Sequence, residues 1–274
     1  MTRKEATGIP YDWSRQALVE PGTVDNFFQL HRPRTPDAVC AEMSRLAYGD
    51  FATVLRPALG RVGFSLIGKP FDRNGTQGFL AAGPDYAVLA FRGSDDVRAW
   101  AVNLSVRPVA WVGRGRVHEG FAGALEAVWP KVGAAVASLD LPLKITGHSQ
   151  GGALAALAAA RCPGAELITF GCPKVGDGDF CASVGAATRY VNNMDIVCRL
   201  PLGVLPLLDV YDHVGDLRFI DDAGNVREPN DRRGMDGFDI SLEAVQQALA
   251  GLSRDRLPRS FADHSPINYV SAIR

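Results

Sequence analysis

The sequence predicts an α/β fold with a mostly parallel central sheet, helices on both faces and an antiparallel edge on its N-terminal side. Three observations predict it. Short apolar runs alternate with segments whose apolar residues recur at helical spacing. The run 86–91 is continuously apolar, as expected of a strand buried on both faces. The pair Asn74-Gly75 lies between two other apolar runs and is typical of a hairpin turn.

The N-terminal third contributes one helix and the antiparallel edge. Residues 1–36 are polar and contain the proline-rich stretch HRPRTP, so we expect an irregular arm laid over the domain. From Asp37 to Ala47 the apolar positions recur at helical spacing. The apolar runs 64–67 and 79–82 flank Asn74-Gly75 and predict antiparallel strands.

The rest of the chain alternates between strand and helix. An apolar stripe predicts a helix from Phe121 to Val136, and an Ala-rich helix begins at Gln150. Further strands are expected at 143–146, at 167–170 and near Tyr190-Val191. A polar surface loop follows Ile220, helical spacing returns from Leu242 to Leu252, and a short helix closes the chain after Asp263. This order of strands and helices predicts a parallel sheet covered on both faces.

Length, composition and charge exclude several classes of protein. The 274 residues are 47% hydrophobic and 22% charged, which fits one globular domain over 1–274 with 1–36 as its arm. Lys and Arg number 29 against 30 acidic residues, a net charge of −1, so a broad nucleic-acid-binding surface is not expected. The five cysteines form no CxxC pair, and we predict neither a metal site nor a full disulfide framework.

The N-terminal sequence bears on localisation. The first thirty residues contain no apolar run of the kind a secretory signal needs, and no eighteen-residue uncharged apolar stretch occurs in the chain. We therefore expect a cytoplasmic protein, or one exported without a cleavable signal peptide, that does not insert stably into a membrane.

A GxSxG sequence stands between a predicted strand and a predicted helix. It is Gly147-His148-Ser149-Gln150-Gly151. In this setting the serine occupies a strained turn that exposes its hydroxyl at the carboxyl edge of the sheet, and small residues two positions before and after it avoid a collision. The backbone amide of Gln150, at the start of the helix, could donate to a developing oxyanion. Ser149 is therefore the candidate nucleophile, and His148 is expected to point away on the sheet side.

A serine nucleophile needs a histidine base and a carboxylate that orients it. Of the five histidines, His148 adjoins the nucleophile, His31 lies in the arm and His118 opens a helix. This leaves His213 and His264. The chain order serine, acid, histidine favours His264. Asp195 follows the strand at Tyr190-Val191 and is the candidate acid; its rivals are Asp209 and Asp212 in a loop.

Six sequence blocks in fixed order resemble the class 3 lipase family of fungal-type triacylglycerol lipases and their bacterial relatives. The blocks are LAFRGS ending at Ser94, VHEGF ending at Phe121, GHSQGGAL ending at Leu154, TFGCPKVG ending at Gly176, NNMDIV ending at Val197 and DHS ending at Ser265. The resemblance implies an α/β-hydrolase fold, Ser149 as nucleophile, Asp195 as acid and His264 as base. It also implies an oxyanion hole at Ser94 and Gln150. Gln150 stands where the family usually has leucine, and Cys172-Pro-Lys replaces a more usual polar-Pro-Arg.

The resemblance implies hydrolysis of carboxylic esters, of acyl lipids in particular, without cofactor or metal. In related lipases the segment after Ser94 acts as a lid; here Val97, Trp100, Ala101 and Leu104 share one helical face, which also fits a fixed surface helix. The apolar loop 201–208 is expected either to wall an acyl pocket or to fill the core. Val97, Trp100, Leu205 and Leu208 are the candidate substrate contacts.

Other functions fit the same residues. A phospholipase, an acyltransferase or a thioesterase would use the same triad and differ in the ester or the acceptor. A catalytically silent lipid-binding or partner-binding module belongs to another class; an intact triad argues against it, because binding alone gains nothing from aligning three such residues.

Overall fold

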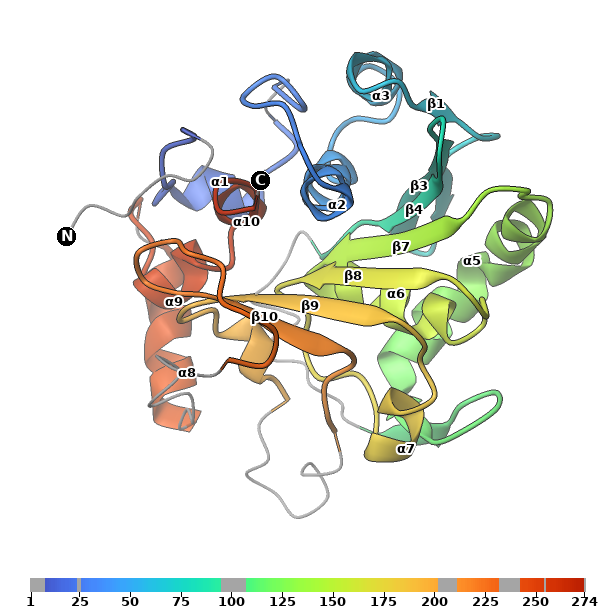
Figure 1. The fold of residues 1–274 in the computed structure, drawn as a ribbon. Coiled ribbons are helices and arrows are strands. Elements are labelled where there is room, and N and C mark those ends of the chain that lie inside the picture. Colours follow the sequence, from blue (N-terminus) through green and yellow to red (C-terminus); the bar gives the residue numbers. More distant parts are fainter. Residues whose placement is uncertain are drawn as a thin grey trace.

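The computed structural model describes residues 8–23, 26–94, 107–201, 211–231, 242–253 and 255–273. Within them, one large sheet runs through the centre of the molecule, as Figure 1 shows. Its strands follow the order β1-β3-β4-β7-β8-β9-β10, with β2 also paired to β3. A separate two-stranded sheet joins β5 (Pro108–Ala110) and β6 (Arg116–His118).

The sheet is antiparallel at its N-terminal edge and parallel elsewhere. The antiparallel strands are β1 (Ser65–Leu66), β2 (Phe71–Arg73) and β3 (Thr76–Ala82), which pairs with β4 (Ala87–Phe91). From β4 onward the strands are parallel: β7 (Leu143–His148), β8 (Glu166–Phe170), β9 (Ala187–Asn192) and β10 (Asp216–Ile220). The predicted turn at Asn74-Gly75 joins β2 to β3, and both of its residues have positive φ. The mostly parallel sheet with an antiparallel N-terminal edge is confirmed.

Helices cover both faces of the sheet. On one face lies α2 (Pro36–Leu46), which begins at a Thr35 cap whose hydroxyl accepts from the Ala38 amide. The other face is covered by α6 (Gln150–Ala159), with α5 (Glu119–Ala137) packed against it. Because side chains alternate along a strand, Val88 and Ala90 of β4 face α2, whereas Leu89 and Phe91 face α5 and α6.

The remaining helices lie at the edges of this arrangement. Their bounds are α1 (Arg15–Val19), α3 (Leu55–Arg61), α7 (Gly178–Cys181), η1 (Val197–Arg199), α8 (Leu242–Ala250), η2 (Gly251–Ser253), α9 (Arg259–Ala262) and α10 (Pro266–Val270). In Figure 1 the segment from α8 to α10 lies beside α1, so the two ends of the described chain are close together.

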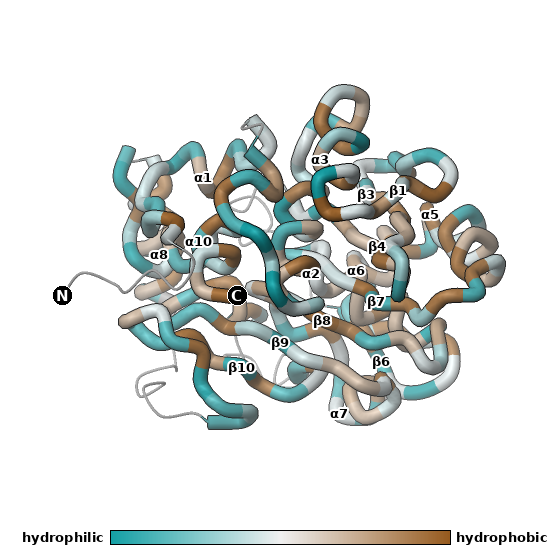
Figure 2. The backbone as a smooth tube through the Cα atoms, turned by 45° about the horizontal axis from the view of Figure 1, so that its top comes forward, coloured by the Kyte–Doolittle hydropathy of each residue, from teal (hydrophilic) through white to brown (hydrophobic). Residues whose placement is uncertain are grey.

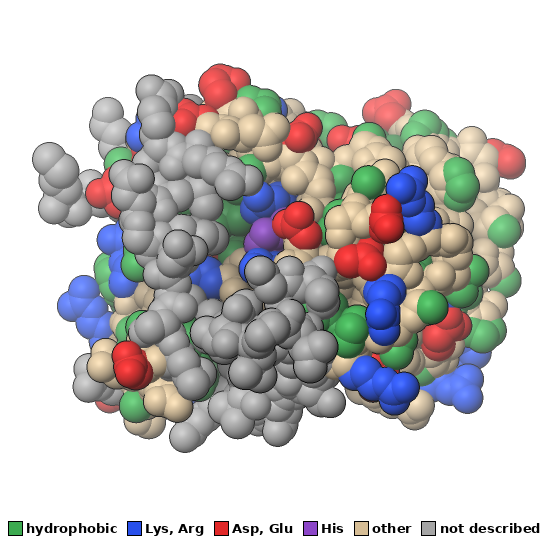
Figure 3. All heavy atoms as spheres, turned by 90° about the horizontal axis from the view of Figure 1, so that it is seen from below, with side chains coloured by type: hydrophobic (Ala, Val, Ile, Leu, Met, Phe, Trp, Pro, Cys, Tyr) green, Lys and Arg blue, Asp and Glu red, His purple; other side chains and the backbone are tan. Residues whose placement is uncertain are grey.

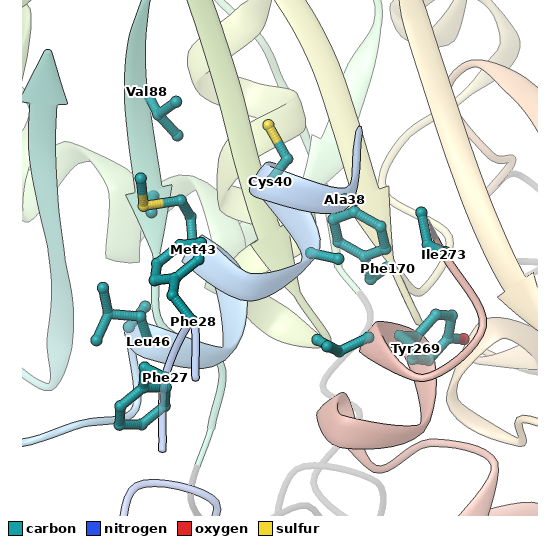
Figure 4. Close-up of a cluster of buried hydrophobic side chains, with 14 of the residues drawn as sticks. Phe27, Phe28, Ala38, Cys40, Met43, Leu46, Val88, Phe170, Tyr269 and Ile273 are labelled. Carbon is teal, nitrogen blue, oxygen red and sulfur yellow. The ribbon is translucent and has the colours of Figure 1, made fainter. Parts of the chain in front are cut away.

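The core consists of two apolar layers that the sheet separates. Figure 4 shows the α2 side, where Cys40 and Met43 lie near Val88 of β4 and Phe170 of β8, with Tyr269 of α10 at the border. In Figure 2 hydrophobic stretches run through the central strands and their covering helices, and hydrophilic residues occupy many outer turns. Figure 3 shows acidic and basic side chains interspersed over the described part of one face, as the near-neutral charge predicts.

The structure contains elements that the sequence patterns did not indicate. These are α3, the β5–β6 pair and β10, which extends the parallel edge beyond β9. The arm is also more ordered than predicted, because it forms α1 and pairs Ser14 with Arg256. The assignment of one domain to 1–274 stays a prediction. Among the described residues, none of the helices is both long enough and apolar enough to cross a membrane.

Candidate active site

Ser149 lies in a sharp turn between β7 and α6. Its backbone has φ 57° and ψ −131°, a conformation that a non-glycine residue rarely adopts. The Ser149 amide donates to the carbonyl of Phe170, and its own carbonyl accepts from the Gly152 amide. These bonds hold the strained turn between two buried elements, as predicted for a GxSxG sequence at a strand–helix junction.

The glycines around Ser149 are required by close backbone approach. A Cβ at Gly147 would lie 2.2 Å from the carbonyl carbon of Gly151. A Cβ at Gly151 would lie 2.4 Å from the carbonyl oxygen of Phe91, at the end of β4. The first turn of α6 is thereby packed directly against the segment that leads to Ser94.

His264 lies within hydrogen-bond distance of both Ser149 and Asp195. Its Nε2 is 3.0 Å from Ser149 Oγ, and its Nδ1 is 2.8 Å from Asp195 Oδ2. All three residues are buried; Ser149 is 2% exposed, and the other two are fully covered. The structure therefore brings together the three residues that the sequence selected, although they are separated by 46 and 69 positions in the chain.

Asp195 is held by donors on both of its carboxylate oxygens. Oδ1 accepts from the Val197 amide at 2.9 Å, and Oδ2 accepts from the Tyr269 hydroxyl at 2.6 Å as well as facing His264. Burial by itself would raise the pKa of this carboxyl, but the charge on His264 and the hydrogen bonds from His264 and Tyr269 outweigh burial and lower the pKa. Asp195 therefore stays ionised in the folded protein.

Asp263, next to the candidate base in sequence, ties the segment of His264 to the turn that carries Asp195. Its Oδ2 accepts from the Met194 amide at 3.1 Å and from Arg259 Nε at 3.1 Å. Its Oδ1 accepts from the Tyr11 hydroxyl at 2.7 Å, so the N-terminal arm takes part in the same network. The sequence pattern did not single out Asp263; the only signal was its place beside His264.

The sequence predicts that His148 points away from the site, but in the structure it lies against His264. Its ring lies 4.5 Å from that of His264, and its Nε2 is 2.7 Å from the His264 carbonyl oxygen. Its Nδ1 is 2.8 Å from the hydroxyl of Tyr48. The expectation was wrong because it considered only the local turn, whereas the chain after α9 places the backbone of His264 against this ring.

Burial, followed by the charge of His264, lowers the pKa of His148 from 6.5 to about 3. The unfolded chain therefore binds a proton at His148 between these pH values, whereas the folded chain does not. We expect the free energy of unfolding to fall as the pH drops from 6.5 toward 3, by up to about 1.4 kcal/mol per pH unit for this group. Urea denaturation at several pH values in this range measures the free energy of unfolding. Its dependence on pH should be weaker for His148→Gln than for the wild type. An equal dependence in both proteins would contradict the lowered pKa of His148.

The other residues considered as acid or base lie away from Ser149 or outside the described residues. Asp212 accepts from the His213 amide through Oδ1, and its own amide donates to the Gly176 carbonyl. His118 caps α5, as predicted, because its Nδ1 accepts from the Gly120 amide. Asp209 and the candidate substrate contacts Val97, Trp100, Leu205 and Leu208 lie outside the described residues, as do the whole predicted lid segment and most of the apolar loop.

The two segments predicted to form an oxyanion hole lie next to each other. A Cβ at Gly93 would lie 2.7 Å from the carbonyl oxygen of His148, so the residue before Ser94 touches the residue before Ser149. Gln150 is the first residue of α6, where backbone amides have no partner within the helix.

The five cysteines are free thiols, and four of them are buried. Across the described ranges, no group of three or more His, Cys, Asp or Glu residues is arranged to hold a metal ion.

Comparison with known proteins finds similarity to lipases, in which a serine, a histidine and an acid of this kind are expected. The model of the family Lipase (class 3) matches residues 88–205. A secreted mono- and diacylglycerol lipase from Fusarium solani is 36% identical over 149 residues, which are 49% of this chain and 44% of the relative. The chain thus spans less than half the length of that relative.

Solved structures extend the similarity to the fold. A triacylglycerol lipase with a serine-protease triad at its catalytic centre shares 27% identity and a TM-score of 0.57, covering 68% of this chain and 78% of that one. A fungal lipase at 19% identity gives a TM-score of 0.60 over 93% of this chain and 96% of that one, which concerns the fold alone. The α/β-hydrolase fold is therefore confirmed.

The same comparison corrects one expectation. The sequence suggested a cytoplasmic protein or one exported without a cleavable signal, but the Fusarium relative is a secreted enzyme, and the localisation prediction is wrong. The family match at 88–205 agrees with the resemblance that the six sequence blocks indicate. The arrangement of the strands agrees with it as well. Over residues 88–205 the chain is similar to the class 3 lipase family.

Proposed function

We propose that the protein hydrolyses carboxylic esters of acyl lipids through an acyl-enzyme intermediate. Ser149 is the nucleophile, His264 the base and Asp195 the residue that orients it. The observation that carries the proposal is the unbroken series from Ser149 Oγ to His264 Nε2 at 3.0 Å and from His264 Nδ1 to Asp195 Oδ2 at 2.8 Å. A series of serine, histidine and carboxylate is what activates a serine hydroxyl.

In the first half of the reaction, His264 Nε2 takes the proton of Ser149 as Oγ bonds to the ester carbonyl carbon. The carbonyl oxygen becomes an oxyanion, which the backbone amides of Ser94 and Gln150 are proposed to stabilise. Collapse of this intermediate breaks the bond to the alcohol, and His264 returns the proton to the leaving oxygen. Water then repeats the sequence on the acyl-enzyme and releases the acid. Asp195 remains ionised and holds the proton of His264 on Nδ1.

The acyl-lipid part of the proposal is supported by the Fusarium relative, which is named for mono- and diacylglycerols. We infer that the substrate is presented at a lipid interface, as in the lipase family, and that the apolar segments 95–104 and 201–208 contact it. The test is a comparison of initial rates on p-nitrophenyl esters from acetate to palmitate, with emulsions of mono-, di- and triacylglycerol and of phospholipid. Hydrolysis of acylglycerols is expected; a folded wild type that hydrolyses none of these esters would refute the proposal.

Asp195→Asn is expected to lower kcat by about 10⁴-fold. An amide nitrogen near the position of Oδ2 would donate to Nδ1, so the proton of His264 would move to Nε2, which could no longer accept from Ser149. The variant should remain folded, because the carboxamide keeps the shape of the side chain. Steady-state kinetics on a soluble ester checks this, and a loss below about tenfold would contradict the role of Asp195.

Gly171, at the end of β8, was missed by the sequence reasoning although it stands in the TFGCPKVG block. Its φ is +60°, and a Cβ there would lie 2.9 Å from both Asp195 Oδ2 and His264 Nδ1. Gly171→Ala would therefore push the acid and the base apart. We expect a fall in kcat of about 10²-fold, the usual cost of displacing a reacting group by about 1 Å. Gly164→Ala is the matched control, because Gly164 also has a positive φ, +86°, but a Cβ there meets nothing within 4 Å; equal activities of the two variants would contradict the expectation.

A further inference from the structure

All four polar atoms of His264 have partners. Its ring nitrogens face Ser149 and Asp195, and its backbone amide donates to the Phe261 carbonyl. Its carbonyl oxygen faces Nε2 of His148 at 2.7 Å. The residue before the nucleophile in the chain thus binds the backbone of the base.

The direction of these hydrogen bonds follows from their chemistry. A carbonyl oxygen can only accept, so His148 Nε2 carries the proton. A neutral imidazole then has its lone pair on Nδ1, and the Tyr48 hydroxyl at 2.8 Å donates to it. Tyr48 therefore stabilises the tautomer of His148 that the His264 carbonyl selects. His148 and Tyr48 are both buried, at 2% and 5% exposure, so water competes little for these bonds.

The same pair touches the segment that precedes Ser94. A Cβ at Gly93 would lie 2.1 Å from the Tyr48 hydroxyl and 2.7 Å from the His148 carbonyl oxygen, so this segment packs directly on both residues. The rings of His148 and His264 are also in contact, with centroids 4.5 Å apart. One small cluster therefore connects the nucleophile's turn, the base and the predicted oxyanion segment.

We propose that His148 is a positioning residue: its Nε2–H holds the carbonyl oxygen of His264, and the Tyr48 hydroxyl stabilises the tautomer of His148 that makes this bond. The inference rests on the proposed function, because positioning matters only if His264 is the base. Two functional requirements meet at this residue. It must be polar enough to bind the carbonyl, and it must stay uncharged beside a ring that becomes an imidazolium during the reaction, since a second positive charge there would oppose protonation of His264. Burial lowers the pKa of His148 to about 3 and meets the second requirement.

A matched pair of substitutions separates positioning from a purely structural role. His148→Gln places its amide nitrogen near the position of Nε2 and can still donate to the His264 carbonyl. His148→Asn places its polar atoms near Nδ1 and can still bind Tyr48, but it does not reach His264. Both variants lose the ring, so both lose similar packing.

We expect His148→Asn to lower kcat by about 30- to 100-fold with KM nearly unchanged, whereas His148→Gln loses no more than about fivefold. The proton NMR signal of His264 Nδ1–H should shift in the Asn variant and keep its position in the Gln variant. Melting temperatures show whether the two variants are equally stable. Equal losses of kcat in the two variants, in proportion to their stabilities, would overturn the inference.

Labelling by a fluorophosphonate separates this inference from the proposed function. A wild type that is neither labelled at Ser149 nor active on esters refutes the proposed function itself; a labelled, active wild type with equal Asn and Gln variants refutes only the role of His148. If neither variant folds, Tyr48→Phe gives the answer, because it removes only the hydroxyl that donates to Nδ1 and stabilises this tautomer. We then expect kcat to fall several-fold at unchanged KM, and an unchanged kcat would overturn the inference.

Discussion

Replacing Ser149 by alanine is expected to lower kcat for ester hydrolysis by about 10⁵- to 10⁶-fold, because members of a triad act as a unit. The substitution removes only Oγ, whose partner is His264 Nε2. The backbone bonds that hold the turn, from the Ser149 amide to Phe170 and from Gly152 to the Ser149 carbonyl, remain. Stability should therefore change little, and the loss of activity can be assigned to the missing nucleophile.

The measurement is steady-state kinetics on a soluble p-nitrophenyl ester together with fluorophosphonate labelling, in which the reagent should modify Ser149 and no other serine. Ser265→Ala is the matched control. Ser265 is also buried and adjoins His264, but its hydroxyl has no hydrogen-bond partner among the described residues. Full activity of Ser149→Ala, or labelling at another serine, would refute the mechanism.

The sequence was sufficient for the features that local patterns determine. Hydrophobic periodicity located the main strands and helices, and the GxSxG sequence located the strained turn at Ser149, because both depend on residues close together in the chain. The short pair β5–β6 lacks such a pattern. Strand β10 was missed because its apolar residues Leu217, Phe219 and Ile220 are interrupted by Arg218, and its position beside β9 depends on pairing with a distant segment.

At the site, the sequence selected the three residues that the structure brings together but not those that hold them. Ser149, Asp195 and His264 stand in blocks with recognisable residue types. The contributions of Tyr48, Asp263 and Gly171 depend on where segments far apart in the chain meet. Tyr48 acts on His148 across 100 positions, and Tyr11 binds Asp263 across 252. The predicted orientation of His148 was wrong for the same reason. Nothing near Ser149 in the sequence indicates that the carbonyl of His264 lies beside the ring of His148.

The second large effect on kcat is expected from replacing the histidine base. The two candidate bases, His264 and His213, give opposite expectations. His264→Ala should lower kcat by about 10⁶-fold, as much as the loss of the nucleophile, and the double variant with Ser149→Ala should be no less active than either single variant. His213→Ala should keep most of the activity, because in the structure the His213 amide binds Asp212, whereas Ser149 Oγ and Asp195 Oδ2 both face His264. Fluorophosphonate labelling of Ser149 should slow in parallel in the His264 variant, since the hydroxyl loses its proton acceptor. An inactive His213→Ala beside an active His264→Ala would transfer the role of base to His213, and the close series from Ser149 through His264 to Asp195 would then need another explanation.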